Sequence, residues 1–172
     1  MKKTFLVFTA AVILLGSCTD KKKASSGNNS FTGETTNTSS GSNDEEKAGN
    51  FTFNGTSFKG ISSTQYFGDK ITGQFSVLCQ QDEPLALLQA VFANEKDALS
   101  GVPLKPAESF YSLEAGEVHV ALSGKAIGDN EFITSSSSSG SISISDKTLI
   151  IKDLKLYNGD HQEKVVNANI SF

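Results

Sequence analysis

Residues 51–58 read Phe-Thr-Phe-Asn-Gly-Thr-Ser-Phe, and this stretch decides the fold class. Asn54-Gly55 is the pair that two-residue β-hairpin turns favour, because both turn positions need a positive φ. A two-residue loop there pairs Phe53 with Thr56 and Phe51 with Phe58. The stretch therefore predicts an antiparallel hairpin.

The chain beyond this hairpin keeps the same pattern of turns and alternating residues. Gly68-Asp69 predicts a second turn, which would place Tyr66 across from Ile71. In three stretches, apolar residues alternate with polar ones at a period of two, which is typical of half-buried strands. The apolar positions are Ile71, Phe75, Val77 and Cys79 in residues 71–79, Val118, Val120 and Leu122 in residues 118–122, and Val166, Ala168, Ile170 and Phe172 in residues 166–172. Residues 141–145 and 148–157 are joined by Asp146-Lys147. Strands separated by regular turns predict a mainly β fold, an antiparallel β-sandwich or barrel.

One segment fits this pattern poorly. Residues 85–99 follow Asp82-Glu83-Pro84 and are rich in helix-forming residues, so Asp82 could cap a helix with Leu85, Leu88 and Phe92 on one face. The same residues could form a buried strand that returns against residues 75–79. Propensity favours one helix near 85–99, and the β-rich context favours a strand.

The composition changes sharply before residue 51. Residues 19–50 consist almost entirely of Ser, Thr, Asn, Gly and charged residues. Such a segment cannot bury enough apolar surface to offset the entropy of ordering it, so we expect a disordered tether. The expected domains are a signal peptide at 1–17, a lipidated N-terminus and tether at 18–50, and a β-rich globular domain at 51–172.

The first eighteen residues have the pattern typical of an export signal. Lys2 and Lys3 precede an uncharged run from Thr4 to Leu15, which is too short for a membrane span of about 20 residues. The run ends in Leu15-Gly16-Ser17-Cys18, which resembles the lipobox of bacterial lipoproteins. The resemblance implies cleavage before Cys18 and attachment of diacylglycerol and palmitate to that cysteine. Two or three acyl chains anchor a protein stably to a membrane.

The tether is similar to those of small Bacteroidota lipoproteins, and residues 51–172 resemble no family that we recognise. In enteric sorting, aspartate directly after the lipidated cysteine retains a lipoprotein at the inner membrane. Thr19 occupies that position, so we expect anchoring to the outer membrane, or to the cytoplasmic membrane if the host has only one.

Composition excludes some classes of partner and chemistry. The net charge is −4 and all 15 basic residues are lysine, so the chain has neither the basic excess expected of a nucleic-acid binder nor arginine for phosphate recognition. With Cys18 lipidated, Cys79 is the single remaining cysteine, and its place in a strand pattern predicts a buried, unreactive side chain.

No catalytic or metal-binding motif stands out. His119 is expected to face solvent from a strand and His161 to lie in a turn, and the two share no metal-ligand spacing. Glu114 and Glu117 flank a turn, with no sign of the cleft that carboxylate catalysis needs. We therefore expect no enzyme, no cofactor and no metal site.

Two functional hypotheses follow. The first is an envelope lipoprotein whose β-rich domain binds a protein or glycan partner or assists envelope assembly. The alternative is a periplasmic carrier of a small apolar ligand, suggested by the 12 phenylalanines, although phenylalanine also fills ordinary cores.

Overall fold

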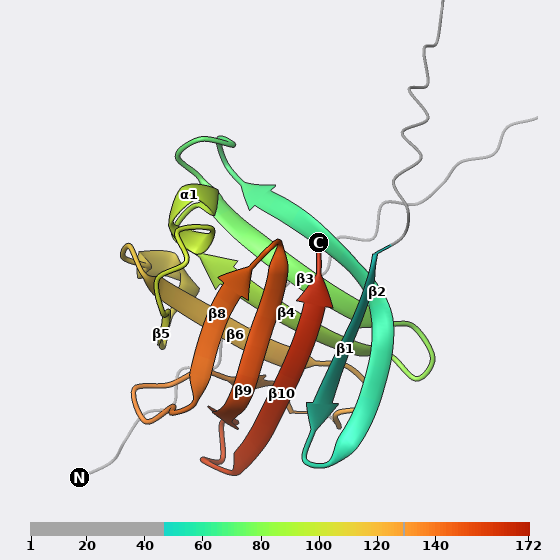
Figure 1. Cartoon of the computed structure of the whole chain (residues 1–172). Coiled ribbons are helices and arrows are strands. Elements are labelled where there is room, and N and C mark those ends of the chain that lie inside the picture. The colour runs from blue at the N-terminus through green and yellow to red at the C-terminus, as the bar shows by residue number, and fades with distance from the viewer. Residues whose placement is uncertain (1–46, 129) are drawn as a thin grey trace, which may run out of the picture. The chain divides into compact units, whose positions relative to one another are not determined.

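A computed structural model of the chain describes residues 47–128 and 130–172. The expected signal peptide, Cys18 and the tether up to residue 46 lie outside the described residues. The fold is mainly β, an antiparallel eight-strand β-barrel with a single short α-helix in the described part. Figure 1 shows β8, β9, β10 and β1 side by side on one wall, with β3, β4 and β6 crossing behind them.

In the described residues, ten strands make up the sheet: β1 (Ala48–Phe53), β2 (Thr56–Phe67), β3 (Gln74–Gln81), β4 (Ala86–Phe92), β5 (Lys105–Pro106), β6 (Glu117–Ser123), β7 (Phe132–Ile133), β8 (Ser141–Ser145), β9 (Thr148–Tyr157) and β10 (Glu163–Ser171). Eight of them close a ring in the order β10-β1-β2-β3-β4-β6-β7-β9, and β9 pairs again with β10. This closure selects a barrel over a sandwich.

The predicted hairpin is confirmed in its register. β1 and β2 pair Phe53 with Thr56 and Phe51 with Phe58. β1 begins at Ala48, before the domain start expected at residue 51. The alternating pattern did not indicate this earlier start, because the inward-facing residue there is Gly49, which has no side chain.

The prediction of a turn at Gly68-Asp69 that pairs Tyr66 with Ile71 is wrong. Residues 68–73 form a longer loop, in which the Asp69 carboxylate accepts the backbone N–H groups of Ile71 and Thr72 at 2.8 and 3.2 Å. Tyr66 consequently pairs with Phe75, and Ile71 lies exposed outside the strand. These hydrogen bonds also lower the pKa of Asp69.

Both alternatives for residues 85–99 occur, one after the other. Residues 86–92 form β4 against β3, because the barrel needs a partner on each edge of the apolar β3 strand. The helix is limited to α1 (Glu95–Ala98), which is capped by the Asn94 side chain accepting the Asp97 N–H at 2.9 Å.

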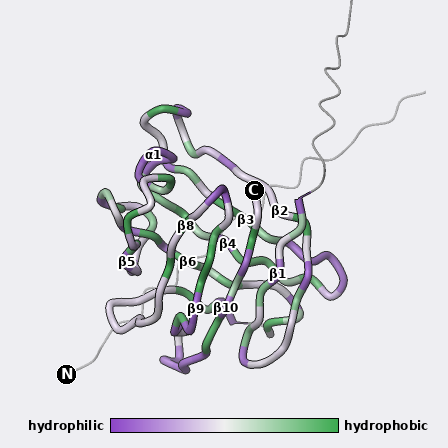
Figure 2. Tube along the Cα trace, viewed as in Figure 1, coloured by the Kyte–Doolittle hydropathy of each residue, from purple (hydrophilic) through white to green (hydrophobic). Residues whose placement is uncertain are grey.

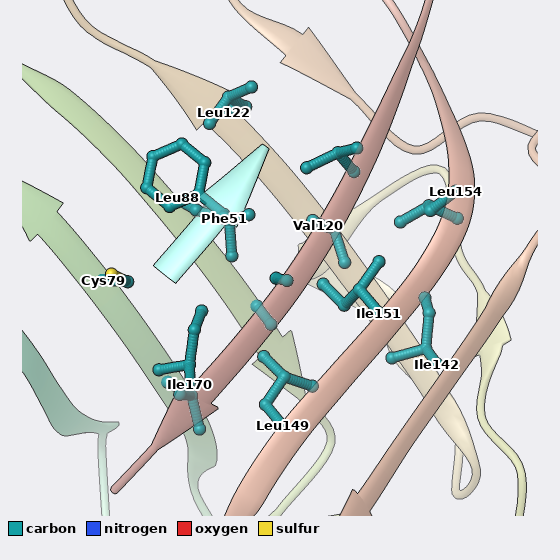
Figure 3. Packing of buried hydrophobic residues seen from close by; sticks show 14 of the residues in the cluster. Phe51, Cys79, Leu88, Val120, Leu122, Ile142, Leu149, Ile151, Leu154 and Ile170 are labelled. Atoms are coloured by element: carbon teal, nitrogen blue, oxygen red, sulfur yellow. The ribbon is translucent and has the colours of Figure 1, made fainter. Parts of the chain in front are cut away.

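Alternate side chains of the strands fill the barrel. The predicted inward-facing residues Val166, Ala168 and Ile170 are buried, and Phe51 and Phe58 stack with ring centroids 5.0 Å apart. Figure 3 shows side chains from different strands gathered between the walls. Along the tube in Figure 2, hydrophobic colour alternates with paler and hydrophilic colour on the strands, whereas the β3–β4 and β9–β10 turns are hydrophilic.

The barrel wall has a seam between β6 and β9. At one end, two-residue β7 joins β6 at Leu122 to β9 at Tyr157. At the other end, two-residue β5 pairs in parallel with β6, and Leu104 bridges to Ile142 of β8. Because few ladder hydrogen bonds cross the seam, side chains must contribute to its closure.

Candidate functional site

A segment after β5 folds back over the outer wall of the barrel. The N–H of Ala107 donates to the carbonyl oxygen of Val118 at 2.8 Å, which holds the segment against β6. The 3-10 turn η1 (Phe110–Ser112) follows, capped by the Ser109 hydroxyl, and the Gln74 side chain donates to the carbonyl oxygen of Phe110. These contacts fix Phe110 beside the outward face of β4 and β6.

The segment forms one wall of a pocket of about 440 Å³ on the outer face of the barrel. Its floor is formed by outward-facing residues of β4, β6 and β7, and its rim carries exposed aromatic rings. The lining residues are Phe67, Gln89, Val91, Glu108, Ser109, Phe110, Tyr111, His119, Ala121, Glu131 and Ile133. Tyr111 is 84% exposed and Phe67 is 47% exposed. We call this space the outer pocket.

His119 lies in the floor of the outer pocket and is only 6% exposed, so its expected exposure to solvent is wrong. It does face away from Val118 and Val120, but residues 107–110 cover it, and the Phe110 ring lies 5.9 Å from its ring. Nδ1 of His119 is 3.1 Å from the carbonyl oxygen of Ala107. A carbonyl only accepts hydrogen bonds, so in the neutral ring Nδ1 carries the hydrogen and Nε2 is an acceptor.

Thr134 supports the pocket from the seam. Its buried hydroxyl donates to the carbonyl oxygen of Ala107 at 2.6 Å and accepts the N–H of Val120 at 3.1 Å. The hydroxyl also lies 3.2 Å from Nδ1 of His119. One side chain thus joins the covering segment, β6 and the histidine.

Acidic side chains surround the outer pocket. Glu108 and Glu131 belong to its lining, and Glu108 also borders a neighbouring hollow that contains Glu114 and Glu117. Glu114 and Glu117 form the predicted turn, with the Glu114 N–H donating to the Glu117 carboxylate at 2.9 Å. No lysine of the described residues lines either space. The side chains that line these two spaces therefore carry negative charge and no lysine charge.

A second hollow of about 340 Å³ lies at one mouth of the barrel. Phe53, Phe58 and Phe132 point into it from the interior, and polar residues such as Gln162 and Lys164 surround it. Phe53 and Phe132 pack edge to face, with centroids 5.0 Å apart. This hollow is the part of the described barrel most relevant to a carrier.

Cys79 is buried, as predicted, and its thiol is not set up for catalysis. Burial raises the pKa of the thiol to about 11, so it remains protonated at neutral pH. His161 lies exposed in the β9–β10 turn, as expected. In the described ranges, no three His, Cys, Asp or Glu side chains are grouped as metal ligands would be.

Comparisons with known proteins give no relative: no family model, no curated protein and no solved structure matches the chain. Within residues 47–128 and 130–172, no helix has the length and apolar character to cross a membrane.

Sequence reasoning did not find the outer pocket. One signal was available: residues 108–112 place two adjacent aromatic rings in a polar segment between Pro106 and the β6 strand. Side chains of neighbouring residues cannot easily both enter a core. In the structure, Tyr111 is the ring of this pair that extends into solvent.

Proposed function

We propose that this protein is a lipid-anchored lipoprotein of the bacterial cell envelope whose β-barrel binds a protein or glycan partner at the outer pocket. The observation that carries the binding role is an apolar pocket with Phe67, Phe110 and Tyr111 exposed at its rim. Exposed aromatic side chains around a concave apolar surface are typical of binding sites. Such binding would also serve a role in envelope assembly.

The anchor is proposed from the first eighteen residues. The basic start, the short apolar run and Leu15-Gly16-Ser17-Cys18 support cleavage before Cys18 and lipidation there. Thr19 supports residence at the outer membrane. The role proposed for the barrel is binding rather than catalysis.

An apolar-ligand carrier is the second candidate. It is favoured by the hollow at the barrel mouth, where three buried phenylalanines of the core form part of the lining. Carriers with barrel folds hold ligands in such mouths. A carrier would retain an apolar molecule through purification, which native mass spectrometry of the detergent-purified chain would detect.

Crosslinking in cells tests the binding role. A benzophenone amino acid replaces Tyr111 in the full chain, and the matched control places it at Ile71, which is also 84% exposed but lies in the β2–β3 loop. We expect a discrete adduct, identified by mass spectrometry, from position 111 alone. The adduct should disappear when Phe67→Ala removes another exposed aromatic ring of the rim. Equal crosslinking from both positions, or an adduct that survives Phe67→Ala, would contradict the proposal.

The anchor has its own test. Cys18→Ala should release the protein from the membrane fraction, because the acceptor of the lipid is gone. Retention of Cys18→Ala in membranes after a high-salt wash would contradict the lipoprotein assignment.

A further inference from the structure

We infer that the occupant of the outer pocket is a polypeptide segment that carries lysine or arginine beside an apolar side chain. The inference rests on the proposed function and names the chemical class of the partner. It depends on three features of the pocket: its uncompensated carboxylates, its exposed aromatic rings and an accessible hydrogen-bond acceptor in its floor.

The carboxylates are not neutralised within the protein. Among the described residues, the one ion pair is Lys155–Glu163 at 2.9 Å, on other strands. Lys105 pairs with Glu117 in the strand register, without forming an ion pair in this structure. Glu108 and Glu131 at the pocket itself have no cationic partner in the described residues. A partner with positive charge is attracted to this surface, and one with negative charge is repelled.

The aromatic rings suit the same partner. The rings of Phe110 and Tyr111 lie with centroids 3.9 Å apart, and Tyr111 extends into solvent. An ammonium or guanidinium group is attracted to the face of such rings. The apolar residues Val91, Ala121 and Ile133 below them offer space for an aliphatic or aromatic neighbour.

His119 adds a directed acceptor. Its Nδ1 is engaged by Ala107, while Nε2 has no hydrogen-bond partner in the part of the chain that the structure describes. No buried polar side-chain atom of these residues lacks a partner, so Nε2 must be accessible, and the space that adjoins it is the outer pocket. A donor from the partner, such as an N–H group, would pair with it.

A glycan fits this pocket less well. Sugars present many hydroxyl groups, each of which needs a polar partner on binding. The pocket offers few neutral polar side chains, chiefly Gln89 and Ser109, and six of its eleven lining residues are apolar. The carboxylates could accept hydrogen bonds from hydroxyl groups, but their charge gives a neutral sugar no long-range attraction.

Binding of synthetic peptides to the detergent-purified full chain tests the inference. The probes are KFKLK, QFQLQ and EFELE, each acetylated and amidated, with chitotetraose as the glycan probe, and calorimetry measures affinity. We expect KFKLK to bind roughly five- to twentyfold more tightly than QFQLQ, since each of two exposed ion pairs contributes up to about fivefold. EFELE and chitotetraose should not bind, and 0.5 M salt should weaken KFKLK binding.

Variants locate the effect. Glu108→Gln with Glu131→Gln should weaken KFKLK binding by roughly five- to twentyfold, whereas Glu83→Gln, in the β3–β4 turn, should leave it unchanged. Tyr111→Leu should weaken binding by about two- to fivefold through the lost cation–π contact. The inference is overturned if EFELE or chitotetraose binds as well as KFKLK, if no peptide binds, or if both glutamine variants behave alike. The crosslinking from position 111 judges the proposed function separately, because it detects a partner of any charge.

Discussion

The hydroxyl of Thr134 donates a hydrogen bond to the carbonyl oxygen of Ala107 at 2.6 Å, at the seam of the barrel. Ala107 precedes β6 in the sequence and Thr134 follows it, and both contact the same edge of β6: the N–H of Ala107 donates to Val118, and the Thr134 hydroxyl accepts the N–H of Val120. A buried side chain thus replaces the ladder hydrogen bonds that short β5 and β7 cannot supply. The same contact holds the segment that forms the wall of the outer pocket.

Thr134→Val should therefore destabilise the protein, although it conserves volume. Removing the hydroxyl leaves the buried N–H of Val120 without a partner, and such a group costs about 1–3 kcal/mol. The matched control is Thr148→Val, where the threonine hydroxyl bonds only to an exposed serine. The control should change stability by no more than about 0.5 kcal/mol. Urea unfolding measures both, and equal effects would show that Thr134 does not close the seam.

Gly60 should tolerate no side chain. It lies where β2 changes from pairing with β1 to pairing with β3, and a Cβ there would overlap the carbonyl oxygen of Gln80. Gly60→Ala must displace backbone, at a cost of about 1–3 kcal/mol. Gly159→Ala is the control, because nothing lies within 4 Å of its Cβ position. A thermal melt that shows the same midpoint for both variants would rule out close packing at Gly60.

Cys79 should make stability fall at alkaline pH. Burial raises the pKa of its thiol from 9.0 to about 11, so the folded state holds the proton more tightly than the unfolded chain. This contribution is complete below pH 9.0 and is lost as the pH rises through about 11. Urea melts over that range should show the free energy of unfolding falling more steeply for the wild type than for Cys79→Ala. Parallel curves would mean that the thiol titrates normally, since the tyrosines are common to both proteins.

The sequence predicted what local chemistry determines. Asn54-Gly55 sets its own turn geometry, and the structure has the predicted pairing of Phe53 with Thr56. Asp146 and Lys147 likewise adopt φ values of 49° and 55°, the positive values that a tight hairpin turn needs. The turn at Gly68 was predicted wrongly because the Asp69 side chain stabilises a longer loop through its own hydrogen bonds.

Features that depend on distant residues escaped prediction. The choice of a barrel over a sandwich is made by β1 pairing with β10, where Gly49 meets Ile170 from the opposite end of the domain. His119 is buried because residues 107–110 cover it, and these residues belong to no strand. The outer pocket arises from these same long-range contacts, so its one local signal, the adjacent aromatic residues Phe110 and Tyr111, does not locate it.

The terminal strand offers the sharpest test of the closed barrel. Ile170 is fully buried between β1 and β9, opposite Gly49 and Leu149, whereas its neighbour Asn169 is exposed on the outer face. Ile170→Ala should cost about 2–5 kcal/mol, because it loses transfer free energy and leaves a cavity in a wall that cannot collapse. Asn169→Ala should stay within about 0.5 kcal/mol.

A domain of this size is stable by roughly 5–15 kcal/mol, so a urea melt separates the two variants clearly. Ile170→Ala should also increase hydrogen exchange at the amides of β1, since β1 and β10 close the ring together. Small and equal effects of both substitutions would mean that the final strand is only loosely attached. The ring would then be open between β1 and β9, and the edges of these two strands that now pair with β10 would be unpaired.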